Sequence, residues 1–146
     1  MKTVLVLSTL FLAVAVAQGS APLPYPPKSP DTIDAYLGSL PDSVNAAYRR
    51  EKLRKDAEAF REEVLEEYLS DLEKFRNNIE QFSRNNELLF ADGTITKDEY
   101  DSNRDKYYQL LNDTYAGGIS DYRNHIRFYR VRIRRIEYIP VIRSNK

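Results

Sequence analysis

Residues 90–101 contain acidic side chains and a glycine at spacings that approach those of a calcium-binding EF-hand loop. Such a loop needs oxygen ligands at its first, third and fifth positions, a glycine at the sixth and a glutamate at the twelfth. With Gly93 at the sixth position, the first and third positions fall on Leu88 and Phe90, which carry no side-chain oxygen. Because calcium takes about six to eight oxygen ligands, the pattern does not predict a calcium site.

The same residues fit a turn followed by the start of a helix. Asp92-Gly93 is a common turn pair. Thr96 and Glu99 have the spacing of a capping box, in which each side chain hydrogen-bonds the backbone N–H of the other residue. The stretch therefore predicts a structural element.

Arginines at helical spacing near the end of the sequence form the clearest candidate binding surface. At about 100° per residue, four of them fall on one narrow face beside a row of Tyr and Ile residues. These four, called the arginine stripe below, are Arg123, Arg127, Arg130 and Arg134. A basic stripe beside an apolar face can bind sulfated glycans or anionic membrane surfaces.

The charge is unevenly distributed, although the net charge is zero. Residues 122–146 hold eight basic residues and one acidic residue, whereas residues 31–121 hold 21 acidic and 12 basic residues. This asymmetry indicates a partner, either inside or outside the chain. The internal alternative is that the stripe pairs with acids of the preceding long helix, namely Glu62, Glu63, Glu66, Glu67, Asp71 and Glu73.

The composition argues against an enzyme. The chain has no cysteine and a single histidine, His125, so we expect no thiol chemistry, no histidine metal site and no Ser-His-Asp triad. His125 is expected on the partly exposed flank of a helix. The many carboxylate pairs are typical of a solvated helix face, not of the dry site that general acid–base catalysis needs. We expect no catalytic residue, metal or cofactor.

One glycosylation sequon is present, Asn112-Asp113-Thr114. Asn112 is a candidate glycosylation site, but it also lies seven residues before Ile119 in an apolar series. Packing there would block the glycan.

The N-terminal residues 1–17 resemble a secretory signal peptide, with Lys2, an apolar segment and an Ala-Val-Ala cleavage site. We therefore expect a secreted, extracellular protein with no stable transmembrane segment after cleavage. Residues 18–41 contain six prolines and predict a proline-rich arm or linker. Within it, APLPYPPKSP (residues 21–30) is expected to be extended and not a core element, and a short helical turn is allowed in residues 32–40. Residues 42–139 are expected to form a helical bundle domain, and residues 140–146 a C-terminal tail.

Apolar residues at steps of three and four predict one long helix over residues about 42–85. The pattern slips by one residue at Val64-Leu65, as in the stutters of coiled coils. After the slip, two series with a seven-residue period form a candidate helix interface. These residues are Leu65, Tyr68, Leu72, Phe75, Ile79 and Phe82.

Two further helices are expected at about 96–116 and 119–139, separated by Gly117-Gly118. The favoured architecture is thus an all-α, elongated antiparallel bundle of three helices, with residues 42–60 projecting or bending over. The alternative is a two-helix long hairpin kinked at Gly117-Gly118.

Two observations favour different arrangements at the glycine pair. Tyrosines keep a seven-residue period across it, which favours a continuous helix; they are Tyr108, Tyr115, Tyr122 and Tyr129. Charge favours a reversal there, because residues 61–82 carry seven acids and three bases while residues 119–139 carry six bases and two acids. The tyrosines complete the candidate interface. They suit a core partly filled by tyrosine because the bundle is thin, a wet helix contact, a dimer interface or a groove for small apolar ligands.

Together these features predict a secreted, non-enzymatic helical protein that acts through surface interactions and self-associates. Self-association is expected because the first helix would expose apolar residues that shorter partner helices cannot cover. The expected partner is another copy or another helical protein. The alternative function is binding of anionic glycans or anionic membrane surfaces through the arginine stripe, and export argues against nucleic acid.

Overall fold

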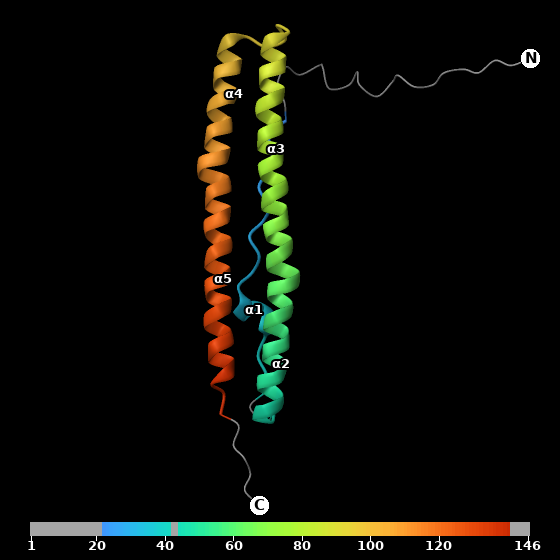
Figure 1. Cartoon of the computed structure of the whole chain (residues 1–146), viewed down its shortest axis with the longest axis vertical. Coiled ribbons are helices and arrows are strands. Elements are labelled where there is room, and N and C mark those ends of the chain that lie inside the picture. The colour runs from blue at the N-terminus through green and yellow to red at the C-terminus, as the bar shows by residue number, and fades with distance from the viewer. Residues whose placement is uncertain (1–21, 42–43, 141–146) are drawn as a thin grey trace, which may run out of the picture.

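The computed structural model of the protein describes residues 22–41 and 44–140 (Figure 1). The expected signal peptide and residues 141–146 of the expected tail lie outside these residues. Within the described ranges all regular structure is helical, which confirms the all-α class. The elements are α1 (Ile33–Leu37), α2 (Ala46–Ala59), η1 (Phe60–Leu65), α3 (Glu66–Ala91), α4 (Lys97–Gln109), η2 (Leu110–Tyr115) and α5 (Ala116–Glu137), where η denotes a π-helical segment.

These elements join into two long helices that lie side by side as a hairpin (Figure 1). The first, α2–η1–α3, has 46 residues, and the second, α4–η2–α5, has 41. The hairpin is the second of the two predicted arrangements. The favoured reversal at Gly117-Gly118 is wrong, because α5 runs through both glycines and lies beside α2 and η1.

The glycine pair has a packing role at its second position. A Cβ atom built on Gly118 would lie 2.4 Å from Cδ2 of Leu72, a buried residue of α3, whereas one built on Gly117 would meet nothing within 4 Å. Gly118 therefore allows the two long helices to approach closely. The glycine pair, which suggested a turn in the sequence, instead marks a close contact between the two helices.

The two π-helical segments explain the phase of the apolar pattern. A π-helical turn holds an extra residue, so the side chains that follow it are displaced around the helix. The first segment, η1, covers Val64-Leu65, where the sequence pattern slips. The second, η2, lies between Tyr108 and Tyr115, so Tyr108 is 52 % exposed while Tyr107 is half-buried. Tyr108 therefore lies outside the buried contact between the two long helices.

Side-chain hydrogen bonds mark where α2 and α4 begin. The start predicted at residue 42 lies outside the described residues, and α2 begins at Ala46, where Asn45 accepts a hydrogen bond from the Ala47 N–H at 2.8 Å. The capping box is confirmed: the Thr96 Oγ1 accepts from the Glu99 N–H at 3.2 Å, and Glu99 accepts from the Thr96 N–H at 2.7 Å. The Thr96 backbone N–H and the Thr96 hydroxyl both donate to the Glu99 carboxylate, and these two hydrogen bonds lower the pKa of that carboxyl.

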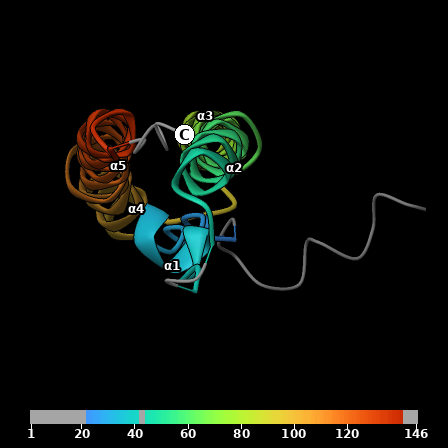
Figure 2. The same ribbon diagram turned by 90° about the horizontal axis from the view of Figure 1, so that it is seen from below.

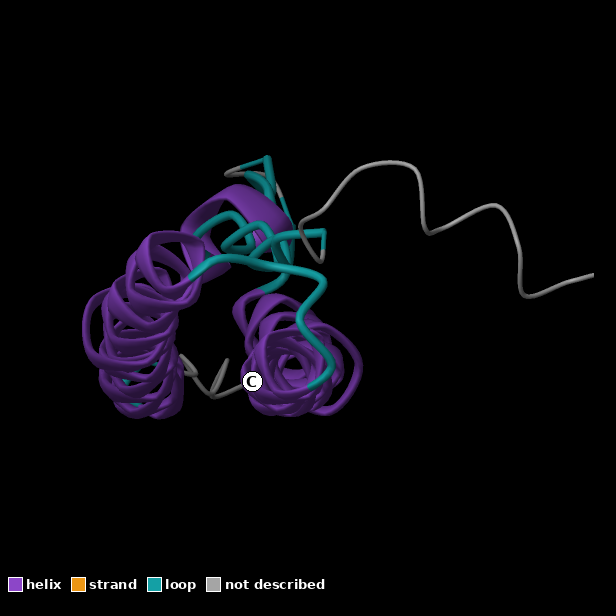
Figure 3. Cartoon of the chain, turned by 90° about the horizontal axis from the view of Figure 1, so that it is seen from above, coloured by secondary structure: helices purple, strands orange, loops and turns teal. Residues whose placement is uncertain are grey.

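The proline-rich arm packs along one side of the hairpin (Figures 2 and 3). Its helical turn, allowed by the sequence, is α1. Ile33 and Leu37 of α1 are 3 % and 7 % exposed and belong to a core cluster with Phe60 and Ile136. The arm therefore contributes to the core at α1, because its two apolar residues, four apart, fill the groove between α2 and α5.

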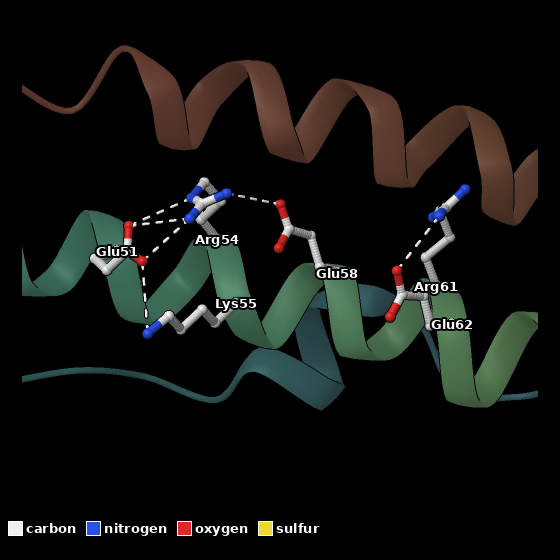
Figure 4. A network of polar contacts seen from close by, with 6 residues as sticks. All are labelled: Glu51, Arg54, Lys55, Glu58, Arg61 and Glu62. Carbon is white, nitrogen blue, oxygen red and sulfur yellow. Dashed lines mark hydrogen bonds and ion pairs between the residues drawn. The ribbon is translucent and has the colours of Figure 1, made fainter.

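Ion pairs do not determine which helices lie side by side. The pairs that link described acids of the first helix connect residues of that same helix, as Figure 4 shows for a network on α2 and η1. Arg54, for example, contacts Glu51 at 3.1 Å and Glu58 at 2.9 Å. Exposed pairs contribute about 0–1 kcal/mol each, so apolar packing outweighs the charge preference that had favoured the reversal.

Candidate binding surfaces on helix α5

Most residues of the candidate helix interface are buried or half-buried in the hairpin. All six members on the first helix are at most 6 % exposed. Of the tyrosines on the second helix, Tyr115, Tyr122 and Tyr129 are half-buried, and the last two pack against the main core cluster. Burial, followed by the negative charge of Glu66, raises the pKa of the Tyr122 phenol.

His125 is buried beside the arm, so the expected partly exposed position on a helix flank is wrong. It is 7 % exposed and lies in a polar cluster with Ser29 of the arm, Asp121 of α5 and Tyr68 of α3. The Ser29 hydroxyl donates to Asp121 Oδ2 at 2.6 Å, and the Tyr68 hydroxyl donates to the same oxygen at 3.2 Å. Burial, followed by the charge of Asp121, raises the pKa of the Tyr68 phenol.

This cluster contains the residue types of a catalytic triad but not its geometry. In a triad the carboxylate holds one ring nitrogen of the histidine while the serine hydroxyl contacts the other. Here Ser29 Oγ and Asp121 Oδ2 lie 3.3 Å and 3.6 Å from the same nitrogen, Nε2 of His125. The serine proton is already directed at the carboxylate. The arrangement fastens the arm to α5.

The arginine stripe lies on the surface of α5. All four of its guanidinium-bearing residues are exposed. Among residues 22–41 and 44–140, no ion pair joins any of them to an acidic side chain. The internal pairing considered for the stripe is therefore not formed by the described residues, and the positive charges face solvent.

A groove of about 340 Å³ lies between the N-terminal end of α1 and α5. Its apolar surface includes Phe128 and Val131, which are 52 % and 40 % exposed. Three arginines border it: Arg127, which belongs to the stripe, and Arg132 and Arg135. Phe128, Val131 and Arg135 were not recognised in the sequence because the wall opposite them comes from the arm.

A second groove of about 700 Å³ lies between α3 and the junction of η2 with α5. Its apolar lining comes from Leu69, Leu111, Tyr115 and Ile119, and Glu73 and Arg123 lie at its edge. Of the predicted interface residues, Tyr115 lines this groove.

The candidate glycosylation site, Asn112, is exposed within η2. The helix packing that was expected to block it is therefore not present at this position. Across the described residues, no three His, Cys, Asp or Glu side chains gather closely enough to hold a metal ion. Every helix in this part of the chain is too short or too polar to cross a membrane.

In comparisons with known proteins, no family model, no curated protein and no solved structure matches this chain.

Proposed function

We propose that the protein is an exported, non-enzymatic helical protein that binds a polyanion, a sulfated glycan above all, through the arginine stripe of α5. The observation that carries this proposal is the exposure of all four stripe residues without an acidic partner among the described residues. Solvated guanidinium groups keep all their donors available, and they bind sulfate or carboxylate groups in a two-pronged geometry.

The spacing of the stripe suits an extended ligand. From Arg123 to Arg134 the helix rises by about 16 Å at 1.5 Å per residue. A chain with repeated anionic groups can contact several of these arginines at once, whereas a single small anion contacts one or two. Multiple weak contacts of this kind produce an affinity that falls steeply with salt.

The test is a calorimetric titration with a size-defined heparin oligosaccharide at several salt concentrations. We expect saturable binding that weakens strongly between about 50 and 200 mM salt, as for other polyanion interactions. The double variant Arg130→Gln/Arg134→Gln should weaken binding about tenfold, because each exposed charge contact contributes on the order of 0.5–1 kcal/mol.

A matched control separates the stripe from net charge. Arg76→Gln/Arg84→Gln removes the same two charges from α3, where both arginines contact Glu80. We expect this variant to bind heparin within about twofold of the natural sequence. Equal losses in both double variants, or binding that is indifferent to salt, would refute the proposal.

Self-association is the second candidate, supported by the apolar groove that the arm leaves open. The sequence predicted self-association from a long first helix that shorter partners could not cover. In the structure the two long helices have nearly equal lengths, and the arm covers part of the first. The groove lined by Leu69 and Leu111 remains as a candidate contact with another copy. Sedimentation velocity over a concentration series tests it: Leu69→Lys should dissociate the oligomer, whereas Leu88→Lys, at a 67 % exposed position away from the groove, should not.

A further inference from the structure

The groove between α1 and α5 differs from the arginine stripe in its chemistry. It combines an apolar floor, Phe128 and Val131, with a wall made by Thr32, Ile33 and Asp34 of the arm. Its volume of about 340 Å³ is at the lower end of the range for small-molecule sites, about 300–1,000 Å³. Large apolar side chains left about half exposed beside cationic groups are a feature of surfaces that bind amphiphilic ligands.

The positive charge of the groove is only partly neutralised within the chain. Arg132 contacts Asp34 of α1, with 3.1 Å between Nε and Oδ1. The guanidinium of Arg127 lies over the ring of Phe128, 5.7 Å from its centroid, so the cation and the apolar floor meet directly. Arg135 forms no ion pair with an acidic side chain of the described residues. Two guanidinium groups therefore flank the floor without a counter-charge.

We propose that this groove binds a single-chain anionic amphiphile, with its carboxylate or phosphate head at Arg127 and Arg135 and its alkyl chain on Phe128 and Val131. A small inorganic anion would leave the apolar floor in water. A neutral alkyl chain would partly desolvate two guanidinium groups without pairing them. The ligand class that satisfies both parts of the groove carries one negative head and one short apolar chain.

This site goes beyond the proposed function, because it shares only Arg127 with the stripe and uses a wall that the arm supplies. The arm is fastened nearby through Ser29 and Asp121. By thermodynamic linkage, a ligand that contacts the docked arm also stabilises its docking.

The test uses decanoate as the probe, titrated by calorimetry into the full mature chain below the concentration at which decanoate forms micelles. We expect saturable binding of one decanoate per chain. Acetate has the head without the chain, and decanol has the chain without the charge. Neither is expected to saturate the site or to displace decanoate.

Variants at exposed positions test whether decanoate binds in this groove. Arg135→Gln and Phe128→Ala should each weaken decanoate binding about tenfold, because one removes a charge-assisted contact and the other part of the buried apolar area. Arg130→Gln, in the stripe but outside the groove, should change it less than twofold. Heparin binding should show the opposite pattern, with loss in the stripe variants and little change in Phe128→Ala, so the two proposals fail separately.

Several results would overturn the inference. Saturation by acetate would mean a simple anion site, and saturation by decanol would mean an apolar site. Binding to vesicles that contain anionic phospholipid, without binding of monomeric decanoate, would mean that α5 recognises a bilayer surface instead. Circular dichroism of Phe128→Ala checks folding, and Arg135→Gln provides an independent readout of the same site.

Discussion

Replacing each glycine of the pair Gly117-Gly118 by alanine should have opposite effects on stability. Both residues are helical, so alanine at either position gains about 0.5–1 kcal/mol in helix propensity over glycine. At Gly117 nothing opposes this gain, because the added Cβ meets no atom within 4 Å. We expect Gly117→Ala to raise the free energy of unfolding by about 0.5–1 kcal/mol.

At Gly118 the added Cβ would lie 2.4 Å from Cδ2 of Leu72. Leu72 is 1 % exposed, so its side chain has little room to move, and overpacking of this kind costs typically about 1–3 kcal/mol. After the propensity gain, Gly118→Ala should be neutral or destabilising by up to about 2 kcal/mol. The difference between the two variants should therefore be about 1–3 kcal/mol.

Urea unfolding followed by far-ultraviolet circular dichroism measures this difference directly. The two variants are matched, since they are adjacent and introduce the same methyl group. Equal stabilisation by both would show that the helices do not approach closely at residue 118. Destabilisation by Gly117→Ala would show that the chain is not helical there, and the hairpin itself would then be in doubt.

Three further predictions concern the turn, the arm and the sequon. Glu99→Gln should destabilise the chain at neutral pH, because folding lowers the pKa of the Glu99 carboxyl. The stability that the carboxylate contributes is therefore present above the unfolded-state pKa and is lost as the pH falls through the folded-state pKa. Unfolding of both proteins from pH 7 to pH 2 should show the difference disappearing in acid. Asp121→Asn should weaken the contact of Ser29, and tryptic cleavage after Lys28 should become faster, whereas an unchanged rate would exclude this cluster as the fastening point. Protein from its source should lose mass on treatment with an N-glycosidase, because Asn112 is exposed, and Asn112→Gln should abolish that loss.

Much of the hairpin could be predicted from local sequence. The spacing of Thr96 and Glu99 specified a capping box, and the series from Leu65 to Phe82 specified the buried face of α3. The slip at Val64-Leu65 was visible as well, because a π-helical segment displaces every side chain that follows. These features depend on neighbours within about two helical turns, which a sequence pattern displays directly.

Features that depend on distant residues were not predictable in the same way. The role of Gly118 depends on Leu72, 46 positions earlier, and the burial of His125 depends on Ser29, 96 positions earlier. Opposite net charge did not predict which helices lie side by side, because acids of the first helix pair with bases of that same helix. One usable signal was missed: Ile33 and Leu37, four apart in a short helix, have the spacing of a small buried face.

The arm thus changes both candidate surfaces on α5. It buries the side of α5 that carries Asp121 and His125, and it supplies one wall of the groove at Phe128. All four residues of the arginine stripe stay exposed, and Arg127 alone among them borders that groove. A segment that composition identifies as a linker therefore determines which parts of the second helix stay exposed as candidate binding surfaces.

Both proposed sites require that α5 lies beside α2, and a distance between spin labels tests this most directly. The chain has no cysteine, so Lys55→Cys and Arg134→Cys place two labels specifically, each two residues from a member of the core cluster, Leu53 and Ile136. Neighbouring helix axes are about 8–10 Å apart, and with the label arms the separation should be roughly 15–30 Å. A reversal of the chain at Gly117-Gly118 would instead displace residue 134 by about 50 Å along the first helix. A distance distribution centred near that longer value would contradict the hairpin and, with it, the assignment of both sites.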